Sequence, residues 1–396
     1  MDWNFLIKNK ESLNVTTDSR KVTPGCIFVA LKGEHFDGNA FVEQARQAGA
    51  EYIISGENAL AELQDLARAW RRELGLPIIG ITGTNGKTTT KELAAAVLST
   101  KYNIYYTQGN LNNQLGVPLT LLSITRAHEM AIVEMGASHP GDIKELVEIA
   151  EPNYGLITNV GRAHLEGFGS FEGVMRTKRE LYDYIIQHGG SIFINEDNPY
   201  LKRMLDAASK PYVPMQLLPY HTGTMPEGTH LVGAYNAENV SAAIRIGQNF
   251  DVWESQALKA IRAYVPSNNR SQLLQTEKNT VIVDAYNANP TSMTAAIEAF
   301  SHYPSAVNSC YILGAMRELG EYSHLEHQNI VNMLLERKAD AVLLVGDEYK
   351  ETTAPYPIFD NVDTLCEYLQ TNKLENKRIL LKGSRSNQLE KVIPLL

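Results

Sequence analysis

The sequence predicts an α/β protein of three domains: a small α/β N-terminal domain, a central domain on a mainly parallel sheet, and a C-terminal Rossmann-like α/β domain. Three observations predict this plan. Apolar runs alternate with helical patterns from residue 77 onward, and a second alternating series begins near Ser271. A chain of 396 residues is also too long for one ordinary core. We place the domains at 1–76, 77–265 and 266–396.

The composition is that of a soluble globular protein, with 44% hydrophobic and 20% charged residues. A net charge of −9 argues against a nucleic-acid-binding surface but leaves room for a local basic pocket. Three widely spaced cysteines, Cys26, Cys310 and Cys366, predict reduced and mostly buried thiols in a cytoplasmic protein. We find no signal-peptide core and no apolar run long enough for a bilayer, so we expect no membrane insertion.

The N-terminal domain combines short strands with two helices. A strand-like run lies at 26–31, and a helical pattern follows at 39–48. The second helix, at 59–74, has apolar residues at helical spacing and ends at Gly75, because glycine is a common helix stop.

The central domain opens on a phosphate loop, which makes it a P-loop-type domain. An apolar strand that begins after Pro77 ends in a glycine-rich turn, and a helix at 91–98 follows. Free backbone N–H groups and the positive end of a helix dipole then face any anion held in the turn. Lys87 supplies a positive charge for the outer phosphates, and the Thr88 hydroxyl is a ligand for Mg²⁺. The residues expected to hold the nucleotide phosphates are Gly83, Thr84, Asn85, Gly86, Lys87, Thr88 and Thr89.

This loop is a shortened variant, because Ile81 stands where the usual pattern has its first glycine. A chance Gly-Lys-Thr in an unrelated turn is the alternative. The strand before it and the helix after it favour the phosphate loop.

Two further strands are expected to bring polar side chains to the same sheet edge, with a helix at 140–150 between them. Glu134 ends the strand at 131–135, and His164 follows the strand at 155–160. Ligands gather at the carboxyl ends of parallel strands, so a carboxylate there is well placed for Mg²⁺. The alternatives are a half-exposed strand-end glutamate and a solvated loop histidine.

Lys178 lies in an amphipathic helical pattern and, taken alone, reads as a surface lysine. An ammonium group cannot ligate a cation. Only a modification to an anion, such as the carbamate formed with CO₂, gives this lysine a metal-binding role.

A helix begins within 233–243, where Asn236 and Asn239 are three residues apart and share one face. Their amides suit the edge of a purine, and helix capping is the alternative for Asn236. The proline-containing stretch 195–229 predicts a loop or small subdomain.

The last domain repeats the pattern of polar residues after apolar strands. Asp284, Asn287 and Asn289 follow one strand, and a solvated turn is the alternative there. Lys382 and Arg385, whose cationic groups suit a phosphate or a carboxylate, lie at the end of the strand at 378–382. Arg270 lies beside a polar turn at 266–269 that predicts a hinge. The predicted strands are 280–284, 310–314, 341–345 and 378–382.

Nearly end to end, these motifs resemble the Mur ligase family of ATP-dependent amide-bond-forming enzymes. Residues 17–20, 28–33 and 37–38 resemble the family's uridine-nucleotide-binding motifs, and 83–88 resembles its ATP loop. Residues 107–120 resemble the segment that meets the UDP-sugar-peptide. The resemblance implies that Lys87, Glu134, His164, Lys178 and Arg270 are the catalytic residues.

The resemblance also assigns the binding residues. Glu134 and His164 match magnesium ligands, and Lys178 matches a lysine that is carbamylated in several members. Asn236 and Asn239 match the adenine-binding helix, Arg270 a phosphate-contacting hinge arginine, and Asp284 a ribose-side acid. The implied substrate-binding residues are Ser19, Arg20, Asn110, Asn112, Asn113, Asn287, Asn289, Lys382, Ser384 and Arg385.

The implied activity joins D-alanyl-D-alanine to the terminal carboxylate of UDP-N-acetylmuramoyl-tripeptide through an acyl phosphate, with ATP and Mg²⁺, in cytoplasmic peptidoglycan precursor synthesis by a monomer. Residues 284–293 and 382–385 favour this member, and the Asp-Asn-Pro-Arg type signature of the third-residue ligase is missing. The alternatives are that ligase, a folylpolyglutamate synthetase, a phosphate-loop NTPase without an acceptor, and an inactive sensor of UDP-sugar-peptides. The chain is short for this activity, which suggests that 195–229 is trimmed.

Overall fold

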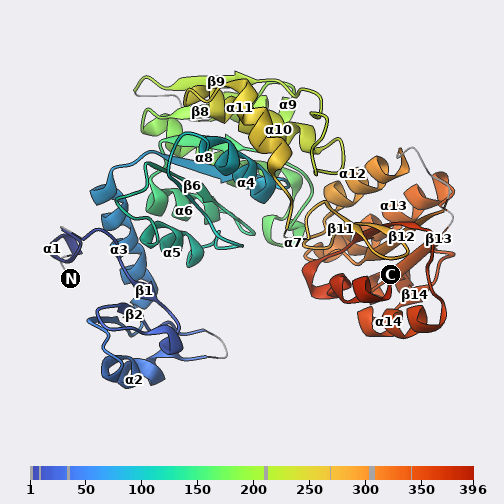
Figure 1. Cartoon of the computed structure of the whole chain (residues 1–396), viewed down its shortest axis with the longest axis horizontal. Coiled ribbons are helices and arrows are strands. Elements are labelled where there is room, and N and C mark those ends of the chain that lie inside the picture. The colour runs from blue at the N-terminus through green and yellow to red at the C-terminus, as the bar shows by residue number, and fades with distance from the viewer. Residues whose placement is uncertain are drawn as a thin grey trace.

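The computed structural model describes residues 3–8, 10–33, 36–208, 213–267, 269–302, 308–339 and 341–396. Asn268, in the predicted hinge turn, lies outside these residues. The chain forms three separate sheets, and the first and last lie on either side of the central one (Figure 1). The predicted α/β fold, with a parallel central sheet and a C-terminal α/β unit, is confirmed. Within the described ranges, no helix combines the length and apolar character needed to cross a membrane.

The N-terminal sheet has three parallel strands in the order β1-β2-β3. The helix α3 (Ala59–Leu74) ends at Gly75, as predicted, and Gly75 has a left-handed φ of 63°. That helix packs on the central sheet, because Trp70 is fully buried there and its indole N–H donates to the carbonyl of Ile124 at 2.8 Å. The elements are β1 (Val15–Thr16), β2 (Ile27–Val29), β3 (Tyr52–Ile54), α1 (Trp3–Ile7), α2 (Val42–Gln47) and α3 (Ala59–Leu74).

The central sheet has six strands, and all of its strand pairs are parallel. In sheet order they are β5 (Ile104–Tyr106), β6 (Met130–Glu134), β4 (Ile78–Thr82), β7 (Tyr154–Ile157), β8 (Ser191–Asn195) and β9 (Gln216–Tyr220). The chain leaves β4 for the edge strand β5, returns to β6 and then passes β4 to reach β7, so the connections that leave the neighbouring strands β4 and β7 run in opposite directions. Such a switch point leaves a crevice at the carboxyl ends of the strands, where ligands bind in open α/β sheets.

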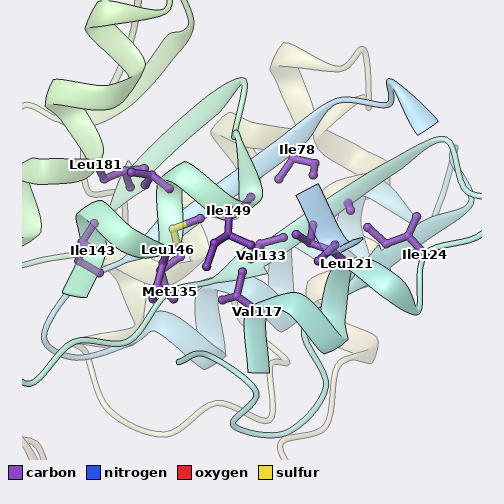
Figure 2. Packing of buried hydrophobic residues seen from close by; sticks show 14 of the residues in the cluster. Ile78, Val117, Leu121, Ile124, Val133, Met135, Ile143, Leu146, Ile149 and Leu181 are labelled. Atoms are coloured by element: carbon purple, nitrogen blue, oxygen red, sulfur yellow. The ribbon is translucent and has the colours of Figure 1, made fainter. Parts of the chain in front are cut away.

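Helices cover both faces of the central sheet, because its side chains alternate between two buried cores. Ile78 and Val133 point to one core with helices α3, α5, α6 and α8 (Figure 2). Ile79 and Ile132 point to the other core, with α4, α10 and α11. The central helices are α4 (Lys87–Leu98), α5 (Gly116–Leu122), α6 (Asp142–Ala150), α7 (Leu165–Phe168), α8 (Phe171–Gln187), α9 (Pro199–Asp206), α10 (Asn236–Asn249) and α11 (Glu254–Ala263).

The expectation of an irregular stretch at 195–229 is wrong, because it contains α9 and the edge strand β9. Asn198 caps α9 by accepting hydrogen bonds from the backbone N–H groups of Tyr200 and Leu201, and Pro199 occupies the first turn. Pro219 lies within β9, and proline is tolerated in a sheet only at such an edge. Only two residues of β9 are buried, so the mostly polar or exposed sequence of this strand is hard to distinguish from a loop.

The C-terminal sheet also has six strands, parallel except for the pairing of β10 with β11. The four predicted strands are confirmed, whereas β10 and β14 escaped prediction because they are short and partly exposed. In sheet order the strands are β10 (Gln272–Gln275), β11 (Thr280–Asp284), β15 (Arg378–Lys382), β12 (Ser309–Gly314), β13 (Ala341–Val345) and β14 (Ile358–Phe359). The helices are α12 (Pro290–Ser301), α13 (Ser323–Glu336) and α14 (Val362–Thr371).

Candidate active site

The glycine-rich turn between β4 and α4 has a backbone that only glycine fits. Gly86 has a φ of 77°, and a Cβ atom there would lie 2.3 Å from Asn239 Oδ1. A Cβ atom on Gly83 would lie 2.0 Å from Thr158 Oγ1. Helix α4 begins at Lys87, four residues before the predicted start. The first N–H groups of α4 therefore open directly onto the turn, in the geometry that binds anions.

Lys87 lies folded over its own loop. Its ammonium donates hydrogen bonds to the carbonyls of Gly83 at 2.8 Å and Thr84 at 3.0 Å. Burial lowers the pKa of Lys87 to about 8, against the raising effect of the Glu134 carboxylate, while the charge of Arg270 lowers it further. The loop thus holds a poorly solvated cation that gains a strong partner when phosphate oxygens arrive.

Glu134 ends β6 beside the loop and is 1% exposed. Its Oε1 accepts hydrogen bonds from Thr88 Oγ1 at 3.2 Å and Asn112 Nδ2 at 2.9 Å. Its Oε2 lies 3.4 Å from Lys91 Nζ and accepts no hydrogen bond within the described ranges. Burial alone would raise the pKa of Glu134, but the charges of Lys91, Lys87 and Arg270 outweigh it and hold the pKa below its ordinary value.

Lys91 was not predicted as a site residue, although it is fully buried on α4. Its position four residues after Lys87 puts both ammonium groups on one helix face, toward Glu134. The four-residue spacing from Lys87 was the feature of the sequence that could have identified Lys91 as a site residue. The half-exposed strand-end alternative for Glu134 is excluded by this burial.

His164 lies after β7, at the start of α7, in a left-handed conformation with a φ of 49°. Its Nδ1 contacts the carboxylate of Glu318, from the C-terminal unit. No cluster of three or more His, Cys, Asp or Glu side chains suited to a metal occurs in the described part of the chain. Any cation here therefore needs ligands of another kind, such as a hydroxyl.

Lys178 is 2% exposed on α8, so the surface-lysine alternative is wrong. Its ammonium lies 5.6 Å from the centre of the Phe168 ring, and His164 contacts the same ring edge-on. Burial holds the pKa of Lys178 well below its usual range, and the charge of Lys87 lowers it further, although Asp142 and Glu180 oppose the shift. Lys178 and His164 therefore share one apolar ring at the margin of the site.

The two asparagines of α10 lock this helix to the phosphate loop. Asn239 Oδ1 accepts a hydrogen bond from Thr90 Oγ1 at 2.9 Å, and its Nδ2 donates to Asn236 Oδ1 at 2.9 Å. Asn236 Nδ2 donates to the Val232 carbonyl at 2.7 Å. Tyr235, not Asn236, is the N-cap of α10, so the capping alternative is wrong.

The C-terminal residues meet at the ends of the neighbouring strands β11 and β15. Asp284 Oδ2 accepts a hydrogen bond from Lys382 Nζ at 2.6 Å, and its Oδ1 accepts one from the Ser271 N–H at 3.3 Å. Lys382 is 1% exposed and Asn289 is 5% exposed. These hydrogen bonds and this burial exclude the alternative that Asp284 and its neighbours form a solvated turn.

Direct hydrogen bonds join the central and C-terminal units across the site. Asn289 Nδ2 donates to Asn85 Oδ1 at 2.8 Å, and Asn85 Nδ2 donates back at 3.4 Å. The Arg162 N–H donates to Thr291 Oγ1 at 3.0 Å, and the Arg162 guanidinium pairs with Glu326 at 2.9 Å. The tip of the phosphate loop therefore contacts the start of α12 directly.

One cavity of about 1010 Å³ lies between these two units. Most of the predicted site residues line it, including the loop, Glu134, His164, Arg270 and Asp284. Sequence reasoning missed Tyr286, Thr291 and Glu318 in its wall, since their place depends on how the units meet. The predicted residues that do not line it are Gly83, Lys178, Asn289, Ser384, Arg385, Ser19 and Arg20.

Most of these exceptions lie close behind the wall. Gly83 and Asn289 contact the lining residues Lys87 and Asn85. Ser19 and Arg20 differ, because they form a 3-10 turn beside the N-terminal sheet, where Arg20 pairs with Asp18 at 2.8 Å.

Comparison with known proteins accounts for this architecture. The middle domain of the Mur ligase family matches residues 81–220, and its glutamate ligase domain matches residues 269–385. The catalytic domain of the Mur ligase family matches residues 13–99.

Relatives match over nearly the full length. The UDP-N-acetylmuramoyl-tripeptide–D-alanyl-D-alanine ligase of Bacillus subtilis is 33% identical, over 96% of this chain and 92% of its own length. The enzyme of that name from Escherichia coli is also 33% identical, over 96% of this chain and 93% of its own. The crystal structure of a MurF ligase from Thermotoga maritima in complex with ADP superposes with a TM-score of 0.84 at 26% identity, covering 100% of this chain and 98% of that one. The chain therefore belongs to the Mur ligase family.

Proposed function

We propose that this chain is an ATP-dependent ligase that joins D-alanyl-D-alanine to the terminal carboxylate of UDP-N-acetylmuramoyl-tripeptide and releases ADP and phosphate. One observation carries the proposal: the phosphate loop and two cations of the C-terminal unit, Arg270 and Lys382, line a single cavity of about 1010 Å³. The full-length relatives that bear this activity in their names support the choice of substrates.

The reaction requires two anions to meet. The tripeptide carboxylate attacks the γ-phosphorus of ATP, and an acyl phosphate forms as ADP leaves. Lys87 and Arg270 line the cavity and supply the positive charge that this transfer needs. The amine of D-alanyl-D-alanine then attacks the acyl carbon, and phosphate departs as the amide bond forms.

A magnesium site fits the residues of the loop. Thr88 and Glu134 supply a hydroxyl and a carboxylate, the hard oxygen ligands that Mg²⁺ prefers, and Glu134 Oε2 lacks a hydrogen-bond donor within the described ranges. When bound, Mg²⁺ offsets phosphate charge during the transfer. His164 would serve a second ion at the margin of the cavity.

Lys178 fits carbamate formation, because its depressed pKa favours the neutral amine that adds to CO₂. The neutral amine nitrogen bonds to the carbon of CO₂ and one proton leaves, so a buried neutral amine becomes an anionic carbamate. We infer that this carbamate lies beside the cation held by His164, since both side chains contact Phe168.

The remaining residues divide between nucleotide and substrates. Asn236 and Asn239 would read the adenine, and Asp284 would meet the ribose; all three line the cavity. Ser19 and Arg20 would bind the uridine end of the long UDP-linked substrate, away from the reacting carboxylate. The asparagines at 110, 112 and 113 would hold its peptide, and the dipeptide substrate would meet Asn287, Asn289, Lys382, Ser384 and Arg385.

We propose domain boundaries at 1–76, 77–265 and 266–396, which the separation of the three sheets supports. We further propose that the protein acts as a monomer in the cytoplasm, where nucleotide-activated precursors are made. Three free cysteines, two of them buried, support a reducing compartment.

A panel of acceptor amines tests the proposal. Purified protein with ATP, Mg²⁺ and UDP-N-acetylmuramoyl-tripeptide should release ADP and give the tripeptide plus two alanines by mass spectrometry only with D-alanyl-D-alanine. ADP release without any acceptor would favour a simple NTPase. ADP release with glutamate and a folate as the acid would favour a folylpolyglutamate synthetase, and ADP release with a diamino acid and the UDP-linked dipeptide would favour the third-residue ligase.

A further inference from the structure

Tyr286 lies in the loop between β11 and α12 and carries two arginines on its ring. The guanidinium carbon of Arg270 lies 3.8 Å from the ring centre, and that of Arg385 lies 5.5 Å from it. These arginines come from different parts of the chain, one beside β10 and one after β15. A single aromatic ring thus gathers two cations, of which Arg270 lines the cavity.

The backbone on both sides of Tyr286 is held in place. Two residues earlier, Asp284 is bonded to Lys382 at 2.6 Å. One residue later, the Asn287 carbonyl accepts from the same ammonium at 3.3 Å. The residues on either side of Tyr286 are therefore tied to the same Lys382 ammonium.

The guanidinium of Arg270 lies against the Tyr286 ring. Its Nε is buried and has no hydrogen-bond partner within the described ranges. A guanidinium stacked at 3.8 Å keeps its edge free to donate to other groups. Two arginines close to one ring also repel each other, and an anion between them relieves that repulsion.

We propose that Tyr286 is a positioning residue that holds Arg270 toward the nucleotide phosphates and keeps Arg385 beside it, behind the cavity wall. This proposal rests on the proposed function, in which Arg270 meets those phosphates and Arg385 meets the dipeptide substrate. Tyr286 does not itself touch the reacting atoms. Its contribution reaches the phosphates through the Arg270 guanidinium that its ring aligns.

The test compares Tyr286→Leu, which removes the ring, with Tyr286→Phe, which keeps it. ATP binding is measured by calorimetry and turnover by ADP release. We expect Tyr286→Leu to weaken ATP binding or lower kcat about tenfold, and Tyr286→Phe to stay within about twofold of the parent, since stacked cations gain on the order of a factor of ten from an aromatic face. Circular dichroism checks that both variants fold.

A double-variant cycle separates positioning from general loosening of the site. In an Arg270→Ala background, Tyr286→Leu should add less than about a twofold further loss. The proposal is overturned if the loss in the double variant equals the product of the losses in the two single variants. It is also overturned if Tyr286→Leu behaves like the parent. If the parent binds ATP but makes no ligated product, the proposed function fails, while the effect of Tyr286→Leu on ATP binding still decides this inference. A parent that binds no ATP overturns both.

Discussion

Replacement of Lys91 by methionine would break a fully buried ion pair at the centre of the site. Lys91 is 0% exposed, and its partner Glu134 is 1% exposed. Methionine fills a similar volume without the charge, so the change isolates electrostatics from packing. The variant would leave the Glu134 carboxylate buried without its nearest cation, with Thr88 and Asn112 as its remaining hydrogen-bond donors.

The size of the effect follows from the 3.4 Å separation of Lys91 Nζ and Glu134 Oε2. At an effective dielectric constant of about 20, two unit charges at that distance attract by about 5 kcal/mol. Removal of one partner from a buried pair costs about 3–5 kcal/mol in measured cases. We therefore expect Lys91→Met to lower the free energy of unfolding by about 4 kcal/mol, or the Tm by roughly 8–16 °C for a domain of 150–250 residues.

Urea denaturation at pH 7.5, followed by circular dichroism, measures this loss. The double variant Lys91→Met/Glu134→Gln should recover at least about half of it, because no unpaired charge remains. Lys278→Met is the matched control, since the solvent-exposed pair of Lys278 with Glu375 should contribute little to stability. A Lys91→Met protein as stable as the parent would refute the reasoning.

Three other predictions concern charge and burial. Lys87→Ala should abolish ADP release while the melting curve stays intact; near-normal turnover would contradict the assigned role. Lys178→Ala should lose ligase activity, with little restored by high bicarbonate, and the carbamate signal of the ¹³CO₂-treated parent should disappear; full activity would exclude the carbamate. Burial raises the pKa of Cys310 to about 12 from 9.0, so the unfolded chain ionises first and stability falls as pH rises above 9. Urea denaturation at pH 8–11 should therefore show that the difference in free energy of unfolding between the parent and Cys310→Ala becomes about 3 kcal/mol smaller by pH 11. A difference that stays constant with pH would contradict the raised pKa of Cys310.

The sequence was most informative where local chemistry decides structure. The phosphate loop was predictable because glycine is required at the positive φ of Gly86. Glu134 and His164 were expected at one edge because parallel strands end on the same side of a sheet. Both line the cavity.

The sequence was least informative where contacts join distant segments. Nothing local pairs Asn85 with Asn289, or His164 with Glu318, because these contacts depend on how two units meet. Lys178 follows an amphipathic pattern, but it lies on the buried side of its helix with Leu181 and Tyr182, whereas Glu172 and Arg176 on the other side are exposed.

In the proposed reaction, the tripeptide carboxylate is activated by the γ-phosphate of ATP. The most direct measurement uses UDP-N-acetylmuramoyl-tripeptide labelled with ¹⁸O in that carboxylate and follows the phosphate released with D-alanyl-D-alanine. The acyl-phosphate route predicts one ¹⁸O atom transferred to phosphate in each turnover. Unlabelled phosphate accompanied by normal peptide-bond formation would contradict it.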